Sequence, residues 1–145
     1  MPDRSAGKQI SHISRSISRY LDAKVNSLNL SYSVIPFLTY LYEHDGVHQD
    51  ELAANLHYDK SSATRAITAL VKQGYVTRQI DKRNKRRNII NVTIKGYTIK
   101  DELILILRRT TQKLFNDFTD EEINLYFKLS DKIDKNLDNM LKSLK

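Results

Sequence analysis

The stretch DKRNKRRNIINVTIKG, residues 81–96, decides the fold of this chain. Its first half is strongly basic, because five of the six residues at positions 82–87 are lysine or arginine. The β-branched residues Ile89, Ile90 and Val92 follow this basic run. A charged turn that leads into a β-branched run predicts a β-hairpin with a basic loop at its tip. Such a hairpin suits an anionic partner.

The residues upstream predict the other strand of the hairpin and a helix-turn-helix. We expect strands at residues 75–80 and 89–93, with the basic loop between them. Two short helices are expected before them, at residues 49–56 and 60–73, joined by a tight turn. Asp59 is the expected cap of the second helix, which has one apolar face and one polar face. The apolar face carries Ala63, Ala66, Ile67 and Leu70, and the opposite face carries Ser61, Arg65, Thr68 and Lys72.

Long amphipathic helices are predicted on both sides of this unit. Apolar residues recur at helical spacing over residues 8–28 and again over residues 96–118. A further helix is expected to begin at Ser31 or Ser33, with Pro36 in or just after its first turn. The sequence TDEE at residues 119–122 is a capping box, which indicates that a last helix begins there.

The expected fold class is mainly α with a small β-hairpin wing (α+β). We expect a winged helix-turn-helix at residues 33–96, and a helical dimerisation region made by residues 1–32 and 97–145. The flanking helices carry longer apolar stripes than a winged helix can cover, which indicates a second copy of the chain. The alternative is that these helices pack only within one chain. Gly46 and Gly74 are expected to end helices with a left-handed backbone.

Charge is concentrated in the middle of the chain. The net charge is +7, and residues 47–96 alone carry ten Lys/Arg against four Asp/Glu. This concentration is the electrostatic footprint of a protein that binds a polyanion, and the alternative is a merely soluble basic face.

Several classes of protein are excluded or made less plausible by composition. The absence of cysteine excludes disulfides and thiolate metal sites. The longest apolar run, residues 103–107, is too short to span a bilayer, and the N-terminal residues lack the apolar core of a signal peptide. We expect a cytoplasmic protein that does not associate with membranes. We find no phosphate-binding glycine loop, nucleophile elbow or metal-ligand spacing, so we expect no enzyme activity, no metal and no cofactor.

The polar face of the helix expected at residues 60–73 indicates that the polyanion is double-stranded DNA. The major groove admits one helix, whose N-terminal residues reach base edges. Arg65 is the expected contact to guanine, whereas Lys60 and Lys72 are expected at phosphates. The basic loop suits the neighbouring minor groove. The complete set of candidate DNA-binding residues is Gln49, Lys60, Ser61, Ser62, Thr64, Arg65, Lys72, Arg83, Lys85, Arg86 and Arg87. Two alternatives stay open: the serines and Thr64 only face solvent, or the loop binds RNA or a membrane surface.

The chain resembles the MarR family of transcriptional regulators from about Ile10 to its C-terminus. The matching segments are DELAANL at residues 50–56, DKSSATR at residues 59–65, LVKQGYV at residues 70–76, and the wing from Arg86 to Gly96. The resemblance implies a homodimer built from the N-terminal helix and the last two helices. It implies a transcriptional regulator, expected to be a repressor that reads a palindromic operator with residues 60–73 in the major groove and residues 81–88 near the minor groove.

Three positions depart from the family pattern. His48 stands where the family usually has a Ser or Thr cap, so the first short helix is expected to be weakly capped. His57 occupies a turn position that is often glycine. Asn84 stands where the family's wing has an aspartate that pairs with arginine, and Asp81 is the expected substitute.

The resemblance also implies release by a small aromatic or phenolic acid. A histidine or arginine could pair with its carboxylate while tyrosines line the ring. The candidates are His12, Arg15, Arg19, Tyr32, Pro36 and Tyr40. The competing interpretation, that the tyrosines belong to the core or an interface, is the stronger one. The alternative function is a non-specific or architectural nucleic-acid-binding protein without a ligand response.

Overall fold

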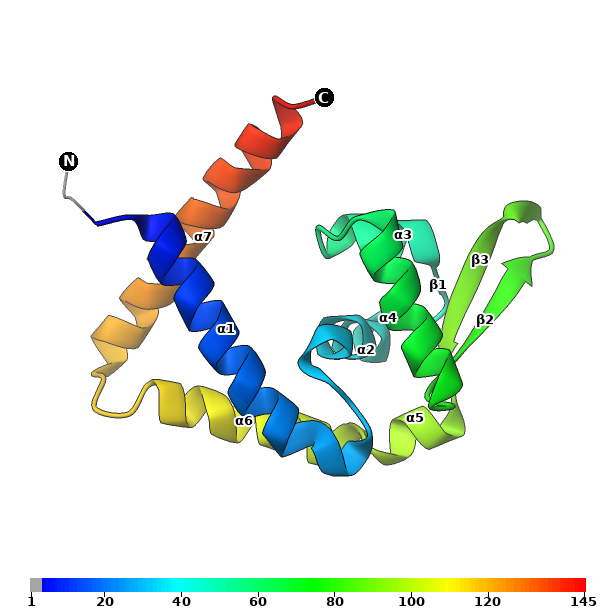
Figure 1. Cartoon of the computed structure of the whole chain (residues 1–145), viewed down its shortest axis with the longest axis horizontal. Coiled ribbons are helices and arrows are strands. Elements are labelled where there is room, and N and C mark those ends of the chain that lie inside the picture. The colour runs from blue at the N-terminus through cyan, green and yellow to red at the C-terminus, as the bar shows by residue number, and fades with distance from the viewer. Residues whose placement is uncertain (1–3) are drawn as a thin grey trace. The chain divides into compact units, whose positions relative to one another are not determined.

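The computed structural model describes residues 4–145 and divides the chain into two compact units (Figure 1). The first unit ends at Leu107, and the second runs from Arg108 to Lys145. Residues 1–3, where the predicted helical region begins, lie outside the described residues. The predicted functional division into 33–96 and its flanking helices stays a prediction.

Helix α1 (Ala6–Val25) opens the first unit. It begins two residues before the predicted start, because the Ser5 hydroxyl accepts a hydrogen bond from the Lys8 backbone N–H at 3.3 Å and caps the helix. It ends in the short 3-10 turn η1 (Asn26–Leu28), followed by Asn29 in the left-handed region at φ 54°. The Leu21 and Val25 side chains are buried in the core, so the last part of α1 anchors it to the first unit.

Helix α2 (Ile35–Glu43) begins differently from the prediction. Neither Ser31 nor Ser33 caps it, because the two hydroxyls bond each other at 2.8 Å and the 3-10 turn η2 (Tyr32–Val34) leads into the helix instead. Pro36 lies in the first turn as expected, where its missing N–H costs little.

The helix-turn-helix consists of α3 (Gln49–Asn55) and α4 (Lys60–Lys72). The turn between them places His57 in the left-handed region at φ 58°. Histidine adopts this backbone less readily than glycine, but the left-handed turn still forms with histidine at this position. Gly74, just past α4, has φ 77°, as predicted.

The sheet has three antiparallel strands in the order β1-β3-β2. These are β1 (Val47–His48), β2 (Val76–Asp81) and β3 (Asn84–Val92). The sequence did not predict β1, which is two residues long and is a strand only because it pairs with β3. The prediction of a long basic loop was wrong. Asp81 pairs with Asn84 across a turn of Lys82 and Arg83, so the basic residues 85–87 belong to β3, at the point where its register with β2 shifts.

The core of the first unit lies where α2, α3 and α4 meet the sheet and helix α6 (Lys100–Leu114). Its fully buried side chains include Phe37, Leu41, Leu52, Ile67, Leu70, Ile90 and Leu103. The Tyr75 hydroxyl donates to the Leu28 carbonyl at 2.5 Å, which joins the end of α4 to the turn after α1. This core holds α4 so that its apolar face points inward.

The long helix expected from residue 96 is two helices, α5 (Ile94–Thr98) and α6 (Lys100–Leu114). The Thr93 hydroxyl accepts from the Gly96 N–H at 3.0 Å, so a capped helix begins at Ile94, before the predicted start.

Helix α7 (Asp120–Lys142) forms most of the second unit. Its predicted capping box is present, with the Thr119 hydroxyl accepting from the Glu122 N–H at 3.2 Å and the Glu122 carboxylate accepting from the Thr119 N–H at 3.0 Å. Phe115 packs edge-on against Tyr126 and Phe127, at ring distances of 5.3 and 5.6 Å. Within residues 4–145, no helix is long and apolar enough to cross a membrane.

Candidate nucleic-acid interface

The N-terminus of α4 is held by its cap. One carboxylate oxygen of Asp59 accepts from the Ser62 backbone N–H at 2.7 Å, and the other accepts from the Ser62 hydroxyl at 2.8 Å. These two hydrogen bonds, the backbone one first, lower the pKa of Asp59. The Ser62 hydroxyl also accepts from the Arg65 guanidinium at 3.1 Å, which orients that side chain. Ser62 therefore stabilises both the cap and the position of Arg65, and its hydroxyl already makes hydrogen bonds to Asp59 and Arg65.

The outer face of α4 is exposed and polar. Lys60, Ser61, Thr64, Arg65 and Lys72 are all exposed, whereas Ser62 is half-buried. The buried face of the helix, which includes Ala63 and Leu70, packs into the core. The face that the sequence assigned to DNA is therefore the face that the fold leaves in solvent.

A groove of about 260 Å³ lies between α3, α4 and β3. It brings together five of the predicted DNA-binding residues from three elements, namely Gln49, Lys60, Thr64, Arg86 and Arg87. The Gln49 amide nitrogen donates to the Thr64 hydroxyl at 3.1 Å, which joins the start of α3 to α4. The Gln49 amide oxygen is buried and has no hydrogen-bond partner among the described residues. It is an acceptor available to a donor that enters the groove.

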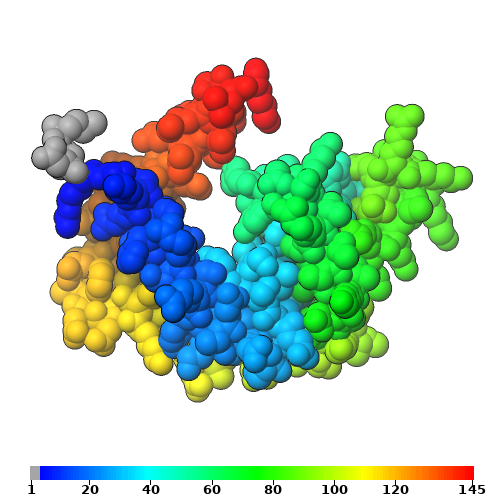
Figure 2. Space-filling view, viewed as in Figure 1, coloured from blue at the N-terminus to red at the C-terminus, as the bar shows by residue number. Residues whose placement is uncertain are grey.

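The wing carries exposed cations. The side chains of Lys82, Arg83, Lys85 and Arg86 are exposed, and the wing stands out from the rest of the winged helix in the space-filling view (Figure 2). Asn84 does not pair with an arginine side chain, because its amide oxygen accepts from the Arg86 backbone N–H at 3.2 Å. The Asn84 side chain therefore holds the backbone at the start of β3 by a hydrogen bond rather than by an ion pair.

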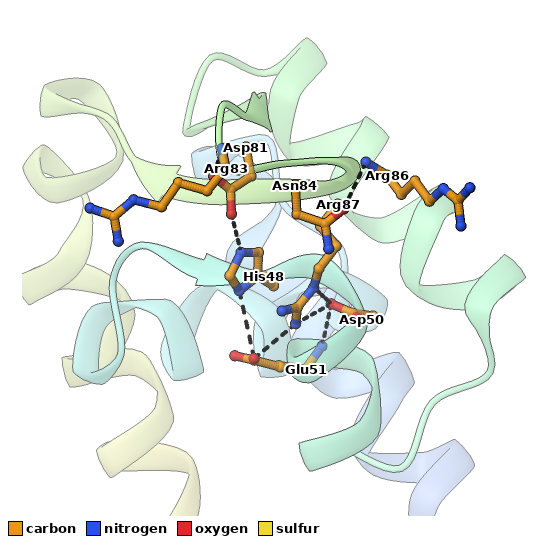
Figure 3. A network of polar contacts seen from close by, with 8 residues as sticks. All are labelled: His48, Asp50, Glu51, Asp81, Arg83, Asn84, Arg86 and Arg87. Carbon is orange, nitrogen blue, oxygen red and sulfur yellow. Dashed lines mark hydrogen bonds and ion pairs between the residues drawn. The ribbon is translucent and has the colours of Figure 1, made fainter.

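Arg87 behaves differently from its neighbours. Its guanidinium donates to Asp50 at 3.0 Å and to Glu51 at 2.8 Å, both in the first turn of α3. In Figure 3 the Arg87 side chain points to these carboxylates, whereas Arg83 and Arg86 extend away from them. The hydrogen bond to Arg87 lowers the pKa of Asp50, and the bonds to Glu51 and then Asp50 raise the pKa of Arg87. A DNA contact by Arg87 stays a prediction. In this conformation its N–H donors already bond Asp50 and Glu51 on α3.

His48 and Asp81 form a second link between the wing and α3. The His48 Nε2 atom lies 2.8 Å from an Asp81 carboxylate oxygen, and its Nδ1 atom lies 3.6 Å from Glu51 (Figure 3). The bond from His48, followed by the Arg83 backbone N–H at 2.9 Å, lowers the pKa of Asp81. Asp81 thus accepts hydrogen bonds from a histidine and from a backbone N–H. We expected Asp81 to pair with an arginine side chain in place of Asn84, and the partner in that prediction was wrong. His48 makes no side-chain cap on α3, as predicted.

The structure adds two residues that the sequence did not suggest. The Arg78 guanidinium on β2 donates to the Thr68 hydroxyl on the outer face of α4 at 3.0 Å, which extends the basic face beyond the helix. Asn88, on β3, lines the groove beside Arg87. The charge of Arg78 was visible in the sequence, but its position beside α4 depends on the packing of β2.

The predicted effector-binding residues lie on two parts of the first unit. His12, Arg15 and Arg19 are exposed along α1, whereas Tyr32, Pro36 and Tyr40 are half-buried around α2. The Tyr40 hydroxyl accepts from the Asn55 amide at 2.8 Å, and its ring stacks on His44 at 4.3 Å. Tyr32 and Tyr40 both pack against the core. These contacts favour the structural interpretation of the tyrosines. Among the described residues, no group of three or more histidines and acids is arranged to hold a metal ion.

Known proteins share this arrangement of a winged helix between long helices. A sequence model of the MarR family matches residues 30–87. The MarR protein from Peptoclostridium difficile is 32% identical and has a TM-score of 0.93, with 100% of this chain and 95% of that chain covered. This chain belongs to the MarR family. The resemblance and the expected fold class are thereby confirmed.

Two further relatives place this MarR-family chain among regulators. YybA of Bacillus subtilis, described as an uncharacterized HTH-type transcriptional regulator, is 27% identical over 131 residues, which cover 90% of this chain and 87% of that protein. A MarR-family regulator from Listeria monocytogenes, complexed with 26mer DNA, is 25% identical with a TM-score of 0.85, covering 94% of this chain and 91% of that one. This MarR-family protein is a DNA-binding transcriptional regulator, not an enzyme.

Proposed function

We propose that this protein is a homodimeric, sequence-specific repressor in the cytoplasm that binds a palindromic operator. The observation that carries the proposal is the exposed polar face of α4 beside a groove whose other walls are α3 and the basic wing. A helix with this face fits the major groove, and a basic hairpin beside it fits the neighbouring minor groove. The Listeria monocytogenes relative complexed with 26mer DNA supports DNA as the partner.

The residues of this interface divide into three groups. Arg65, Ser61 and Thr64 are proposed to meet base edges, because they are exposed near the start of α4. The phosphate and minor-groove contacts are proposed for Gln49, Lys60, Lys72, Arg83, Lys85 and Arg86. Ser62 is proposed to act through the cap and through Arg65, and Arg87 through α3.

The homodimer is supported by apolar surface that a single chain leaves exposed. No residue of α7 is buried in the described chain, and its side chains Leu125, Ile133 and Leu137 are 51%, 46% and 45% exposed. Ile10 and Ile13 on α1 are 49% and 46% exposed. Water-exposed stripes of this length are favourable only when another surface covers them. A two-fold dimer would present two copies of α4 to the two halves of a palindrome.

An aromatic or phenolic acid is the proposed effector, with His12, Arg15 and Arg19 as its candidate cationic contacts. Such a ligand can release DNA only by binding one dimer conformation better than the other. Tyr32, Pro36 and Tyr40 are the candidate apolar contacts. The contacts of Tyr40 with Asn55 and His44 would have to be compatible with that binding.

Selection of bound sequences from random duplex DNA tests the proposal. The experiment uses the 145-residue chain at one fixed salt concentration, with and without benzoate and 4-hydroxybenzoate. We expect an enriched palindrome and lower recovery of DNA when an effector is present. Equal affinity for the selected and scrambled duplexes would instead support the second candidate, a non-specific or architectural protein. The concentration of positive charge in residues 47–96 is the observation that keeps this candidate in view.

A further inference from the structure

Both strands of the wing are tied to the first turn of α3. Strand β2 ends at Asp81, which bonds His48 at 2.8 Å, and β3 carries Arg87, which bonds Asp50 at 3.0 Å. Glu51 is shared by the two ties, because it lies 2.8 Å from Arg87 and 3.6 Å from His48. We call these five residues the wing tie; Figure 3 shows them around the start of α3.

His48 replaces a different kind of contact. A Ser or Thr at this position would cap α3 with its own hydroxyl, whereas the His48 side chain makes no cap bond. Its ring instead bridges the end of β2 and the first turn of α3. His48 therefore makes a contact between the helix-turn-helix and the wing, where a Ser or Thr would make a contact inside one helix.

The ring of His48 faces acids on both sides. A neutral imidazole carries one N–H and can donate to one carboxylate only, whereas the charged imidazolium donates from both nitrogens. The charged groups around the ring are Asp81 from β2, with Arg83 in the turn behind it, and Glu51 from α3, with Arg87 from β3 behind it. The two acids lie 2.8 and 3.6 Å from the ring nitrogens, so a positive charge on the ring strengthens both contacts.

The His48–Asp81 pair in the wing tie is partly buried. The side chains of His48 and Asp81 are only 22% and 13% exposed, so salt screens this pair less than a fully exposed one. The other end of the tie reaches α4, because Gln49 follows His48 directly and bonds Thr64 at 3.1 Å. The angle of the wing and the position of the recognition helix are therefore linked through the start of α3.

We propose that His48 and Arg87 are positioning residues for DNA binding, and that protonation of His48 tightens the wing tie and so strengthens binding. The inference rests on the proposed function, in which the wing and α4 contact the same DNA. In this inference neither His48 nor Arg87 has to touch the DNA. Histidine side chains in general change charge near neutral pH, so the test compares DNA affinity at about pH 6 and about pH 8.

Measurement of DNA affinity against pH tests the proposal. We expect wild-type protein to bind its selected duplex about threefold more tightly at about pH 6 than the His48→Thr variant does, and to match it at about pH 8. Threonine restores a capping residue to α3, so this variant should fold while losing the tie. His44→Gln removes a histidine outside the tie and should keep the wild-type pH profile. Identical pH profiles for wild type and His48→Thr would overturn the proposal.

Two further variants keep the test decisive. Asp81→Asn leaves an acceptor for His48 but removes the charge, and should flatten the pH profile in the same way. Arg87→Gln should weaken binding at both pH values, with Arg87→Lys recovering part of the loss. If Arg65→Ala and Arg86→Ala weaken binding but none of the tie variants changes affinity or its pH profile, the wing tie is wrong and the proposed function stands. If Arg65→Ala and Arg86→Ala have no effect, the proposed function itself fails.

Discussion

The amide nitrogen of Gln49 donates to the hydroxyl of Thr64 at 3.1 Å, which joins the first turn of α3 to the outer face of α4. This bond leaves the amide oxygen of Gln49 buried without a partner among the described residues. The start of α3 therefore has contacts to α4 through Gln49 and to the wing through its neighbours Asp50 and Glu51.

Arg65→Ala should relax sequence preference at one base-pair position in each half-site. Arg65 is exposed on α4 and its guanidinium is oriented by Ser62, so its remaining donors can reach a base edge. We expect a loss of about 1–3 kcal/mol in discrimination at that position. Binding to a panel of single-substitution operators measures it, with Lys128→Ala on α7 as the control. An unchanged preference profile would remove Arg65 from base readout.

Arg86→Ala should weaken binding to operators with A·T-rich flanks. The Arg86 side chain is exposed and extends away from the wing tie, so the variant removes a cation without breaking that tie (Figure 3). We expect the slope of log affinity against log salt concentration to fall by about 1 if Arg86 meets a phosphate. Titrations at several salt concentrations measure this slope. Unchanged affinity and slope would mean that the wing tip does not engage DNA.

Gly96→Ala should destabilise the protein. A Cβ at this position would overlap the Tyr75 carbonyl oxygen and crowd the Val92 side chain, and the backbone oxygen cannot rotate away. We expect a loss of about 2 kcal/mol in the free energy of unfolding, the usual size for overpacking. Urea denaturation measures it, with Gly7→Ala as the matched control. The nearest atom to a Cβ at Gly7 is 4.0 Å away, so that variant should be neutral or slightly stabilising. Equal effects of the two substitutions would contradict the prediction.

Asp59→Asn should weaken the dependence of stability on acid pH. The Ser62 backbone N–H, and then its hydroxyl, hold the pKa of Asp59 below its usual range. A carboxyl with a lowered folded-state pKa stabilises the protein above its unfolded pKa, and this contribution is lost as the pH falls through the folded value. Asparagine still caps α4 but does not titrate. The free energy of unfolding should therefore vary less with pH below about pH 4.

Urea denaturation at a series of acid pH values compares Asp59→Asn with wild type. Asp131→Asn, which changes an exposed carboxylate in the middle of α7, is the control. The same change of slope in both variants would show that the cap of α4 has no special part in it.

Ile133→Asp should weaken self-association. The side chain is 46% exposed on α7 in the single chain, within the apolar stripe proposed to contact a second copy. Burying a carboxylate there is unfavourable, so we expect the dimer to dissociate at least about tenfold more readily. Sedimentation at several protein concentrations measures the change. Lys132→Asp places the same side chain at the neighbouring exposed position and should leave association nearly unchanged. A monomeric wild-type chain would contradict the dimer itself.

Local features could be predicted from the sequence because their causes lie within a few residues. The cap of α4 by Asp59 and the capping box at Thr119 depend on a side chain and a backbone N–H three residues away. The left-handed backbone at Gly46 and Gly74 follows from the missing Cβ. The exposed face of α4 follows from helical periodicity, so most of its candidate DNA contacts could be named from the sequence.

The sequence by itself thus determined most of the helices, the caps of α4 and α7, the hairpin and the polar face of α4. Only the tertiary structure decided which charges meet. Arg86 and Arg87 are equivalent in the sequence, yet Arg87 pairs with Asp50, 37 residues away, while Arg86 remains exposed. The short strand β1 and the partner of Asp81 depend in the same way on contacts between distant segments. Periodicity records which face of an element is apolar, but distances between elements are set by the packing of the core between them.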